Sequence, residues 1–252
     1  MVKTVPRGAP PRPVITVGKL GAAASGITLA PIAYAPSCIL DPASHCPRGT
    51  WGGARNRADR SSLHLSAASV SGMKEAARFA ERIGLAFNRH WTVHYQMAGI
   101  FEHDGAAFIG RLLALVRKHV HRAGGELAAL WARENGDRKG GHVHILLHVP
   151  SGITLRNLTK RWIKAAGGDP ARRVSQVRTI GGALTSAKVG GEHYRANAEA
   201  VLAYLLKAAS FETGKALALP RSGEGGTIIG KRAGWTQNIG ANARSKAGTM
   251  RV

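Results

Sequence analysis

The sequence predicts an α+β domain with a central antiparallel sheet and flanking helices. Three observations predict it. Short apolar segments of strand character alternate with longer segments whose apolar residues recur at helical spacing. Their order is strand, helix, strand, strand, helix, strand, which is the split βαβ arrangement of ferredoxin-like and RRM-like domains. A turn-rich segment between the two middle strands favours a hairpin, and a hairpin makes that pair antiparallel.

The first half of this domain is predicted to hold a helix, a strand and a second helix. Apolar residues recur at helical spacing over 72–87, and a strand over 90–97 follows directly. The second helix covers 108–122, where residues such as Leu112 and Val116 form its apolar stripe. No internal repeat is visible.

The two central strands are predicted over 126–134 and 142–149. The second is rich in β-branched and apolar residues and is stopped by Pro150, which indicates a buried central strand. Residues 135–141 between them are dense in Asn, Asp and Gly, as in a turn.

The second half is predicted to hold a helix over 154–166, a strand over 173–179 and a helix over 197–210. The last helix carries apolar residues such as Val201 and Leu205 at helical spacing. It also carries the tyrosine discussed below.

Two histidines lie on one side of the second central strand. Side chains alternate faces along a strand, so His142 and His144 project together, with Cα atoms about 6.6 Å apart at roughly 3.3 Å per residue. This spacing suits two imidazoles that converge on one metal ion. His148 shares the face but lies about 13 Å beyond His144, which makes it a bystander or a substrate contact.

Glu134 is the predicted oxygen ligand of the same ion. The hairpin brings it alongside His142, and a divalent cation that polarises a phosphate favours a carboxylate beside its imidazoles. We therefore predict a Mg²⁺ or Mn²⁺ site made by Glu134, His142 and His144. The alternative is a chance His-x-His pattern with Glu134 as a rim carboxylate.

Tyr204 and Lys207 are the predicted nucleophile and its helper. A phenol has a reference pKa near 10, so at neutral pH it is a weak nucleophile until a neighbouring cation favours the phenolate. Lys207 lies three residues after Tyr204 on the same face of the predicted helix. The alternative is a core tyrosine with a lysine whose stem packs on it.

The order of Glu134, then His142-Val143-His144, then Tyr204-Leu205-Leu206-Lys207 resembles the HUH endonucleases. The resemblance is to their single-tyrosine replication initiators and covers roughly residues 88–210. Their first motif, an apolar strand around a threonine, is matched by Thr92 and His94 within residues 91–95. Phage-type initiators carry a second tyrosine one helical turn away, where this chain has Ala200 and Ala208.

The resemblance implies a sequence-specific DNA nicking and joining enzyme. The metal would polarise the scissile phosphate and Tyr204 would attack it, which leaves the 5′ phosphate on the tyrosine and a free 3′ hydroxyl as a primer. Lys207 would position the phosphate or the phenol. The implied setting is rolling-circle replication of a plasmid or small phage from a single-stranded origin, with a host helicase and polymerase as partners, in the bacterial cytoplasm.

Two rivals remain open at this stage. A single-tyrosine transposase would use the same chemistry. A non-catalytic single-stranded nucleic-acid binder on the same architecture would keep His142 and His144 as core or stacking residues, and it would need neither metal nor Tyr204.

The charge distribution defines two tails. The formal net charge of +22 favours a polyanionic partner. Residues 1–62 are basic and rich in Pro and Gly, which predicts an unstructured arm, and 63–212 form the nuclease domain. Residues 213–252 are a basic, Gly-rich extension in which Arg232 and Trp235 are candidate DNA contacts.

Two further patterns argue against other classes of site. Cys38, His45 and Cys46 lack a fourth ligand at suitable spacing, so we expect no structural zinc. Residues 225–232 match a phosphate-binding loop until Arg232 replaces its Ser or Thr, so we expect a plain loop. No apolar run is long enough for a membrane helix.

Overall fold

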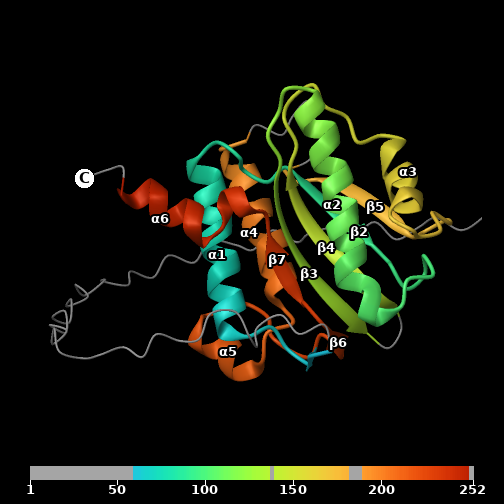
Figure 1. Cartoon of the computed structure of the whole chain (residues 1–252). Coiled ribbons are helices and arrows are strands. Elements are labelled where there is room, and N and C mark those ends of the chain that lie inside the picture. Colours follow the sequence, from blue (N-terminus) through green and yellow to red (C-terminus); the bar gives the residue numbers. More distant parts are fainter. Residues whose placement is uncertain (1–58, 137–138, 182–188, 250–252) are drawn as a thin grey trace, which may run out of the picture. The chain divides into compact units, whose positions relative to one another are not determined.

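A five-stranded antiparallel sheet with helices on both faces organises the chain (Figure 1). The structure is a computed structural model that describes residues 59–136, 139–181 and 189–249. The predicted α+β class is confirmed. Cys38, His45, Cys46 and nearly all of the predicted arm lie outside the described residues.

The sheet has the strand order β5, β2, β4, β3, β7. β3 and β4 form the predicted hairpin at its centre, and Glu134 stands opposite His142 in their register. β2 pairs with β4 on one side and with β5 on the other. The five strands are β2 Arg89–Val93, β3 Ala128–Gly136, β4 Gly140–His148, β5 Ser175–Thr179 and β7 Ala233–Trp235.

The helices divide between the two faces of the sheet: α2 and α3 cover one, and α1 and α4 cover the other (Figure 1). Short 3-10 turns, η1 (Glu102–Asp104) and η2 (Gln237–Ile239), precede α2 and α6. The helices are α1 Ala67–Arg82, α2 Gly105–Arg122, α3 Leu158–Ala165, α4 Glu192–Leu206, α5 Phe211–Ala216 and α6 Ala241–Thr249.

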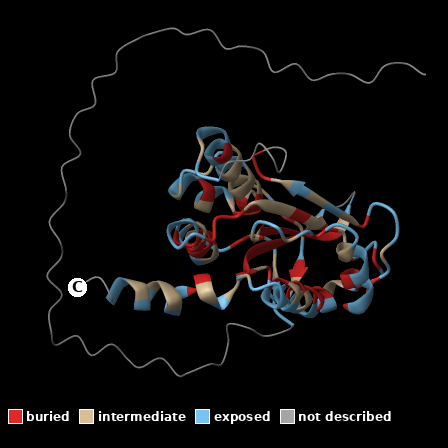
Figure 2. Ribbon diagram, turned by 90° about the horizontal axis from the view of Figure 1, so that it is seen from above, coloured by how far each residue is buried: buried red, intermediate tan, exposed pale blue. Residues whose placement is uncertain are grey.

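Each face of the sheet has its own apolar core. Odd-numbered residues of β3, such as Trp131, pack under α2 and α3, and even-numbered ones, such as Leu130, pack toward α1 and α4. Burial on both faces explains the unbroken apolar runs of the central strands. Figure 2 shows the buried residues concentrated in the sheet and on the inward sides of the helices, while α6 has none. Each large apolar side chain that is fully buried contributes about 1.5–3 kcal/mol.

The predicted ends of the first helix and first strand were wrong by several residues. α1 begins at Ala67 because the Ser66 side chain accepts a hydrogen bond from the Ser69 amide and caps it. β2 ends at Val93, and the next residues turn, with the Ala98 amide donating to the carbonyl of His94. The other helices and strands differ from prediction at their ends by up to five residues.

The tyrosine helix runs earlier in the chain than predicted. α4 covers Glu192–Leu206, so Tyr204 lies in its last turn and Lys207 is the C-cap residue. The reason lies beyond it: the Ser210 side chain accepts a hydrogen bond from the Thr213 amide and caps α5. A residue that caps the following helix cannot continue the preceding one.

The predicted tail boundaries do not coincide with the edges of this fold. β1 (Ser61–Ser62) pairs with β6 (Ile228–Ile229), which draws the end of the predicted arm into the domain. β7, predicted as part of an extension, adds the fifth strand beside β3. Residues 225–232 were expected to form a plain loop, but Ile228–Ile229 form β6 and only the residues on either side are irregular.

No helix among the described residues is long and apolar enough to cross a membrane.

Candidate active site

Glu134, His142 and His144 converge beneath α4. The first comes from β3 and the two histidines from β4, and their side chains share one face of the sheet through the pairing of Glu134 with His142. One ligand atom of each lies within 4.8 Å of the others. All three residues are buried, with 7%, 5% and 4% of their surface exposed. The predicted group is present and could hold a metal ion.

Neighbouring groups orient both imidazoles toward Glu134. A carbonyl only accepts, so His142 Nδ1–H donates to the Gly140 carbonyl at 2.9 Å and leaves Nε2 facing the Glu134 Oε2 at 3.5 Å. His144 Nδ1 lies 3.0 Å from the Thr92 hydroxyl and 3.2 Å from His90 Nε2. A metal-binding histidine is normally held this way through its second nitrogen.

The remaining nitrogen of His144 is the best test of whether this group fits a metal. His144 Nε2 is buried, has no hydrogen-bond partner among the described residues, and lies 4.0 Å from the Glu134 Oε2. Buried polar atoms are nearly always partnered, so one left open toward a carboxylate indicates a ligand position. The residues present therefore fit a divalent cation.

The protonation states also fit. Burial lowers the pKa of His144 to about 3, which keeps the imidazole neutral. Burial alone would raise the pKa of Glu134, but the neighbouring His142 together with the hydrogen bonds and charge of Lys207 holds it well below its usual value. Both groups are deprotonated at neutral pH, the form in which they bind metal.

Tyr204 lies against this group. Its ring meets the His144 ring edge-on, with centroids 4.9 Å apart, and the Lys207 ammonium lies 4.0 Å from the centroid of the tyrosine ring. Tyr204 is half-buried and lines a hollow of about 440 Å³ together with both histidines. The predicted neighbourhood of Tyr204, Lys207 and the metal ligands is thus present.

Lys207 lies beside the Tyr204 ring, as predicted, and it also makes a contact that the sequence did not predict. Its ammonium donates to both carboxylate oxygens of Glu134. Lys207 is the C-cap residue of α4, and its side chain reaches across to Glu134 on β3.

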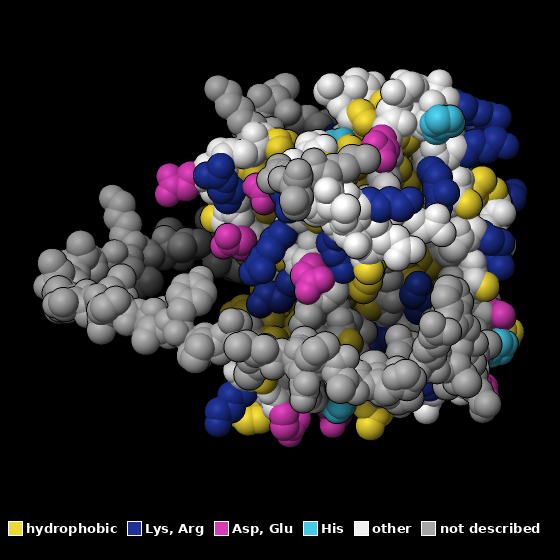
Figure 3. Space-filling model, turned by 60° about the vertical axis from the view of Figure 1, so that its left-hand side comes forward, with side chains coloured by type: hydrophobic (Ala, Val, Ile, Leu, Met, Phe, Trp, Pro, Cys, Tyr) yellow, Lys and Arg dark blue, Asp and Glu magenta, His cyan; other side chains and the backbone are white. Residues whose placement is uncertain are grey.

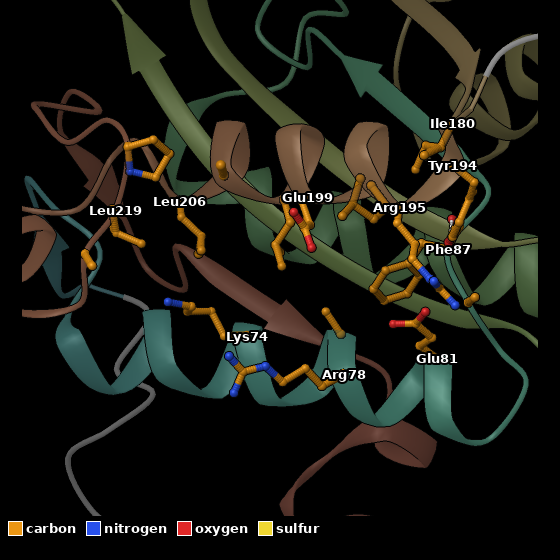
Figure 4. Close-up of a pocket in the computed structure, with 18 residues that line it drawn as sticks. Lys74, Arg78, Glu81, Phe87, Ile180, Tyr194, Arg195, Glu199, Leu206 and Leu219 are labelled. Carbon is orange, nitrogen blue, oxygen red and sulfur yellow. Dashed lines mark hydrogen bonds between the residues drawn. The ribbon is translucent and has the colours of Figure 1, made fainter. Parts of the chain in front are cut away.

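Tyr194 is excluded as a second nucleophile. It is buried and its hydroxyl donates to the Phe87 carbonyl at 2.6 Å. Burial raises the pKa of Tyr194 to about 12. It belongs to a separate hollow of about 430 Å³ between α1 and α4 (Figure 4). That hollow shares no lining residue with the one that contains Tyr204.

Of the three other predicted DNA contacts, Thr92 and His94 lie at the hollow and His148 does not. Thr92 and His94 line the hollow, and the His94 ring stacks on His142 with centroids 5.2 Å apart. His148 lies outside the metal group, as the distance argument predicted, and donates from Nδ1 to the Ala86 carbonyl at 2.9 Å.

The two DNA contacts predicted in the tail are wrong in their placement. Arg232 is buried, and its guanidinium donates to the Ser62 hydroxyl and to the Ser62 and Gly226 carbonyls. Trp235 is half-buried in β7, and its ring packs so closely on Gly72 of α1 that a Cβ there would lie 2.6 Å from it. Both residues hold the fold together.

Sequence reasoning missed four polar residues that line the hollow: His90, Lys139, Gln176 and Arg178. His90 contacts His144, while Gln176 and Arg178 line the opposite wall from β5. The signal for His90 was available, because it alternates with Thr92 and His94 along β2. The wall from β5 depends on a strand pairing that the sequence does not reveal.

The basic residues are not gathered into one stripe on the face shown in Figure 3, where Lys and Arg are interspersed with Asp and Glu. Arg178 and Lys139 are both exposed at the hollow. They are the cations best placed to meet an anionic substrate there.

Comparison with family models, with curated proteins and with solved structures gave no match to this chain.

Proposed function

We propose that this protein is a metal-dependent enzyme that nicks and rejoins single-stranded DNA through a phosphotyrosine on Tyr204. One observation carries the proposal. The tyrosine ring lies 4.9 Å from the ring of His144, whose open nitrogen faces a buried carboxylate. A nucleophile beside a buried ligand group, in an open hollow, is the arrangement that phosphoryl transfer needs.

The architecture agrees with the family resemblance. We infer a split βαβ arrangement, which is supported by the chain order β2, α2, β3, β4, α3, β5 and by the strand order β5, β2, β4, β3. We infer the HUH nuclease type of this fold, with its histidine pair on a central strand and its tyrosine on the helix above.

The reaction we infer is a displacement at phosphorus. The Tyr204 oxygen would form a bond to the scissile phosphorus while the bond to the 3′ oxygen breaks. The phenol proton would pass to solvent, and the 3′ oxygen would take up a proton and leave as a hydroxyl. The phosphotyrosine keeps a phosphodiester in place of the one broken, so the reverse attack rejoins the strand without ATP.

A divalent cation on Glu134, His142 and His144 would supply charge stabilisation of the phosphate oxygens. We infer Mn²⁺ or Mg²⁺, and the two imidazole ligands favour Mn²⁺. Thr92 and His90 would hold the His144 ring in place, and Arg178 and Lys139 would bind flanking phosphates.

A single nucleophile sets the biological role that we propose. Ala200 lines the hollow one turn before Tyr204, so that position offers no second hydroxyl. A site with one tyrosine suits initiation of rolling-circle replication on a plasmid or small phage, where one nick yields the primer.

The test is covalent trapping. The full chain is incubated with Mn²⁺ and a pool of labelled single-stranded oligonucleotides, and protein–DNA bands that survive denaturant are scored. We expect a band for the wild-type chain and none for Tyr204→Phe, which keeps the packed ring and removes the hydroxyl. Retained DNA binding with no band in either chain would instead indicate a non-catalytic binder.

A further inference from the structure

Lys207 and a metal ion compete for the same carboxylate oxygen. The ammonium of Lys207 donates to the Glu134 Oε2, and this oxygen also faces His142 Nε2 at 3.5 Å and His144 Nε2 at 4.0 Å. It is therefore the oxygen through which Glu134 would join the two imidazoles around an ion.

Both cations cannot use Oε2 from the same side at once. A divalent ion and an ammonium within one ligand distance repel each other, and the buried setting strengthens that repulsion. The second carboxylate oxygen gives no relief, because Lys207 donates to it as well.

Lys207 is free to leave, whereas the metal ligands are fixed. Its side chain is 28% exposed, against 9% for the side chain of Glu134. It extends from the C-cap of α4 and already lies 4.0 Å from the centroid of the Tyr204 ring. A rotation of its flexible stem would carry the ammonium toward the tyrosine hydroxyl and the hollow.

We propose that metal binding displaces Lys207 from Glu134 and delivers its ammonium to the side of the site where Tyr204 and the phosphate meet. This inference rests on the proposed function. Lys207 would then bind Glu134 in the metal-free protein and contact the substrate phosphate once the metal is bound. A strand that engages the ammonium should in turn raise the metal affinity, because coupling between two ligands is reciprocal.

The first test measures Mn²⁺ affinity without DNA, by calorimetry and by the electron paramagnetic resonance signal of unbound Mn²⁺. Lys207→Met keeps the length of the side chain and removes its charge, so Mn²⁺ should bind more tightly by at least about fivefold. Arg178→Gln is the matched control, because it removes a cation of the same hollow that does not contact Glu134. It should change the affinity less than about twofold.

The outcomes separate this inference from the proposed function. Unchanged or weaker Mn²⁺ binding by the Met variant, or an equal gain in the Arg178 control, would overturn the exchange while leaving the metal site intact. If neither chain binds Mn²⁺, both the exchange and the metal-dependent function fail.

The second test is made on the wild-type chain, with His144→Ala as a control. Lysine acetylation by a water-soluble reagent is followed by mass spectrometry with and without Mn²⁺. Lys207 should react several times faster with Mn²⁺, whereas Lys215 on α5 should not change. His144→Ala should abolish the difference. An equal rate for Lys207 in both conditions contradicts the displacement.

Discussion

Arg133 and Glu134 are neighbours on β3, yet their side chains enter opposite faces of the sheet and two different environments. The Arg133 guanidinium is fully buried and makes five hydrogen bonds, to Tyr95, to both the carbonyl and carboxylate of Glu102, and to the Ile229 and Lys231 carbonyls. Glu134 faces an imidazole nitrogen with no partner among the described residues.

The difference separates a structural network from a site. A buried charge whose donors are all used fixes elements in place, and here it ties β3 to η1 and to the β6–β7 segment. A buried group left partly unsatisfied, with perturbed pKa values around it, is typical of a functional site. Adjacent residues thus belong to a satisfied network on one face and to a candidate metal-binding group on the other.

The largest expected effect tests the structural half of this comparison. Arg133→Met should destabilise the protein by about 3–5 kcal/mol, because it leaves Glu102 and several carbonyls without their donor. Glu134→Gln should cost about 1 kcal/mol or less, since the partly exposed side chain of Lys207 can turn to water. Urea unfolding of the two variants measures both. Equal losses would contradict the division between the two faces.

Loss of a metal-binding histidine should have the second-largest effect. His142→Ala and His144→Ala should each lower cleavage and Mn²⁺ affinity by more than about 100-fold, since even the groups behind metal ligands typically cost 10–100-fold. His148→Ala is the control on the same strand and face, and we expect less than about a threefold change because its imidazole is bonded to Ala86. A loss at His148 as large as that at His144 would show that the ligand set is wrong.

The sequence was sufficient for the hairpin and its ligands for a physical reason. The Asn, Asp and Gly residues of 135–141 predict a hairpin turn, and a strand period of two then places Glu134 opposite His142 and puts His144 on the same face. The same logic failed for β7, because Ala-Gly-Trp has little strand character and pairs only where β3 offers an open edge. The contact of Lys207 with Glu134 was missed because the two residues are 73 positions apart, and no local pattern in the sequence reveals such a pairing.

A smaller loss of Mn²⁺ affinity is expected when a residue that orients the His144 ring is changed. Thr92→Val keeps the shape of the side chain but removes the hydroxyl that lies 3.0 Å from His144 Nδ1. Mn²⁺ affinity should fall by roughly tenfold. Thr179→Val on β5 offers a control for the substitution itself, and titration with Mn²⁺ compares the two. An unchanged affinity in the Thr92 variant would show that His90 alone orients the ring.

The smallest effect concerns pH and the metal-free protein. Burial lowers the pKa of His90 to about 4 and that of His144 to about 3, against about 6.5 in the unfolded chain. Below pH 6.5 the unfolded state therefore binds more protons, so stability falls as pH decreases. Between pH 7.5 and 6.0 we expect a loss of about 0.8 kcal/mol from His90. His90→Gln should reduce the loss seen in urea unfolding, and an unaltered pH dependence would contradict the burial argument.

The most direct test of the central claim is to locate the covalent link. Trypsin should release residues 196–207 as one peptide between Arg195 and Lys207, and Tyr204 is its only tyrosine. The adduct formed with Mn²⁺ is trimmed with nuclease and analysed by mass spectrometry. We predict a nucleotide mass on this peptide, with the modification at Tyr204. A nucleotide on the peptide that contains Tyr95 or Tyr194 would contradict the account.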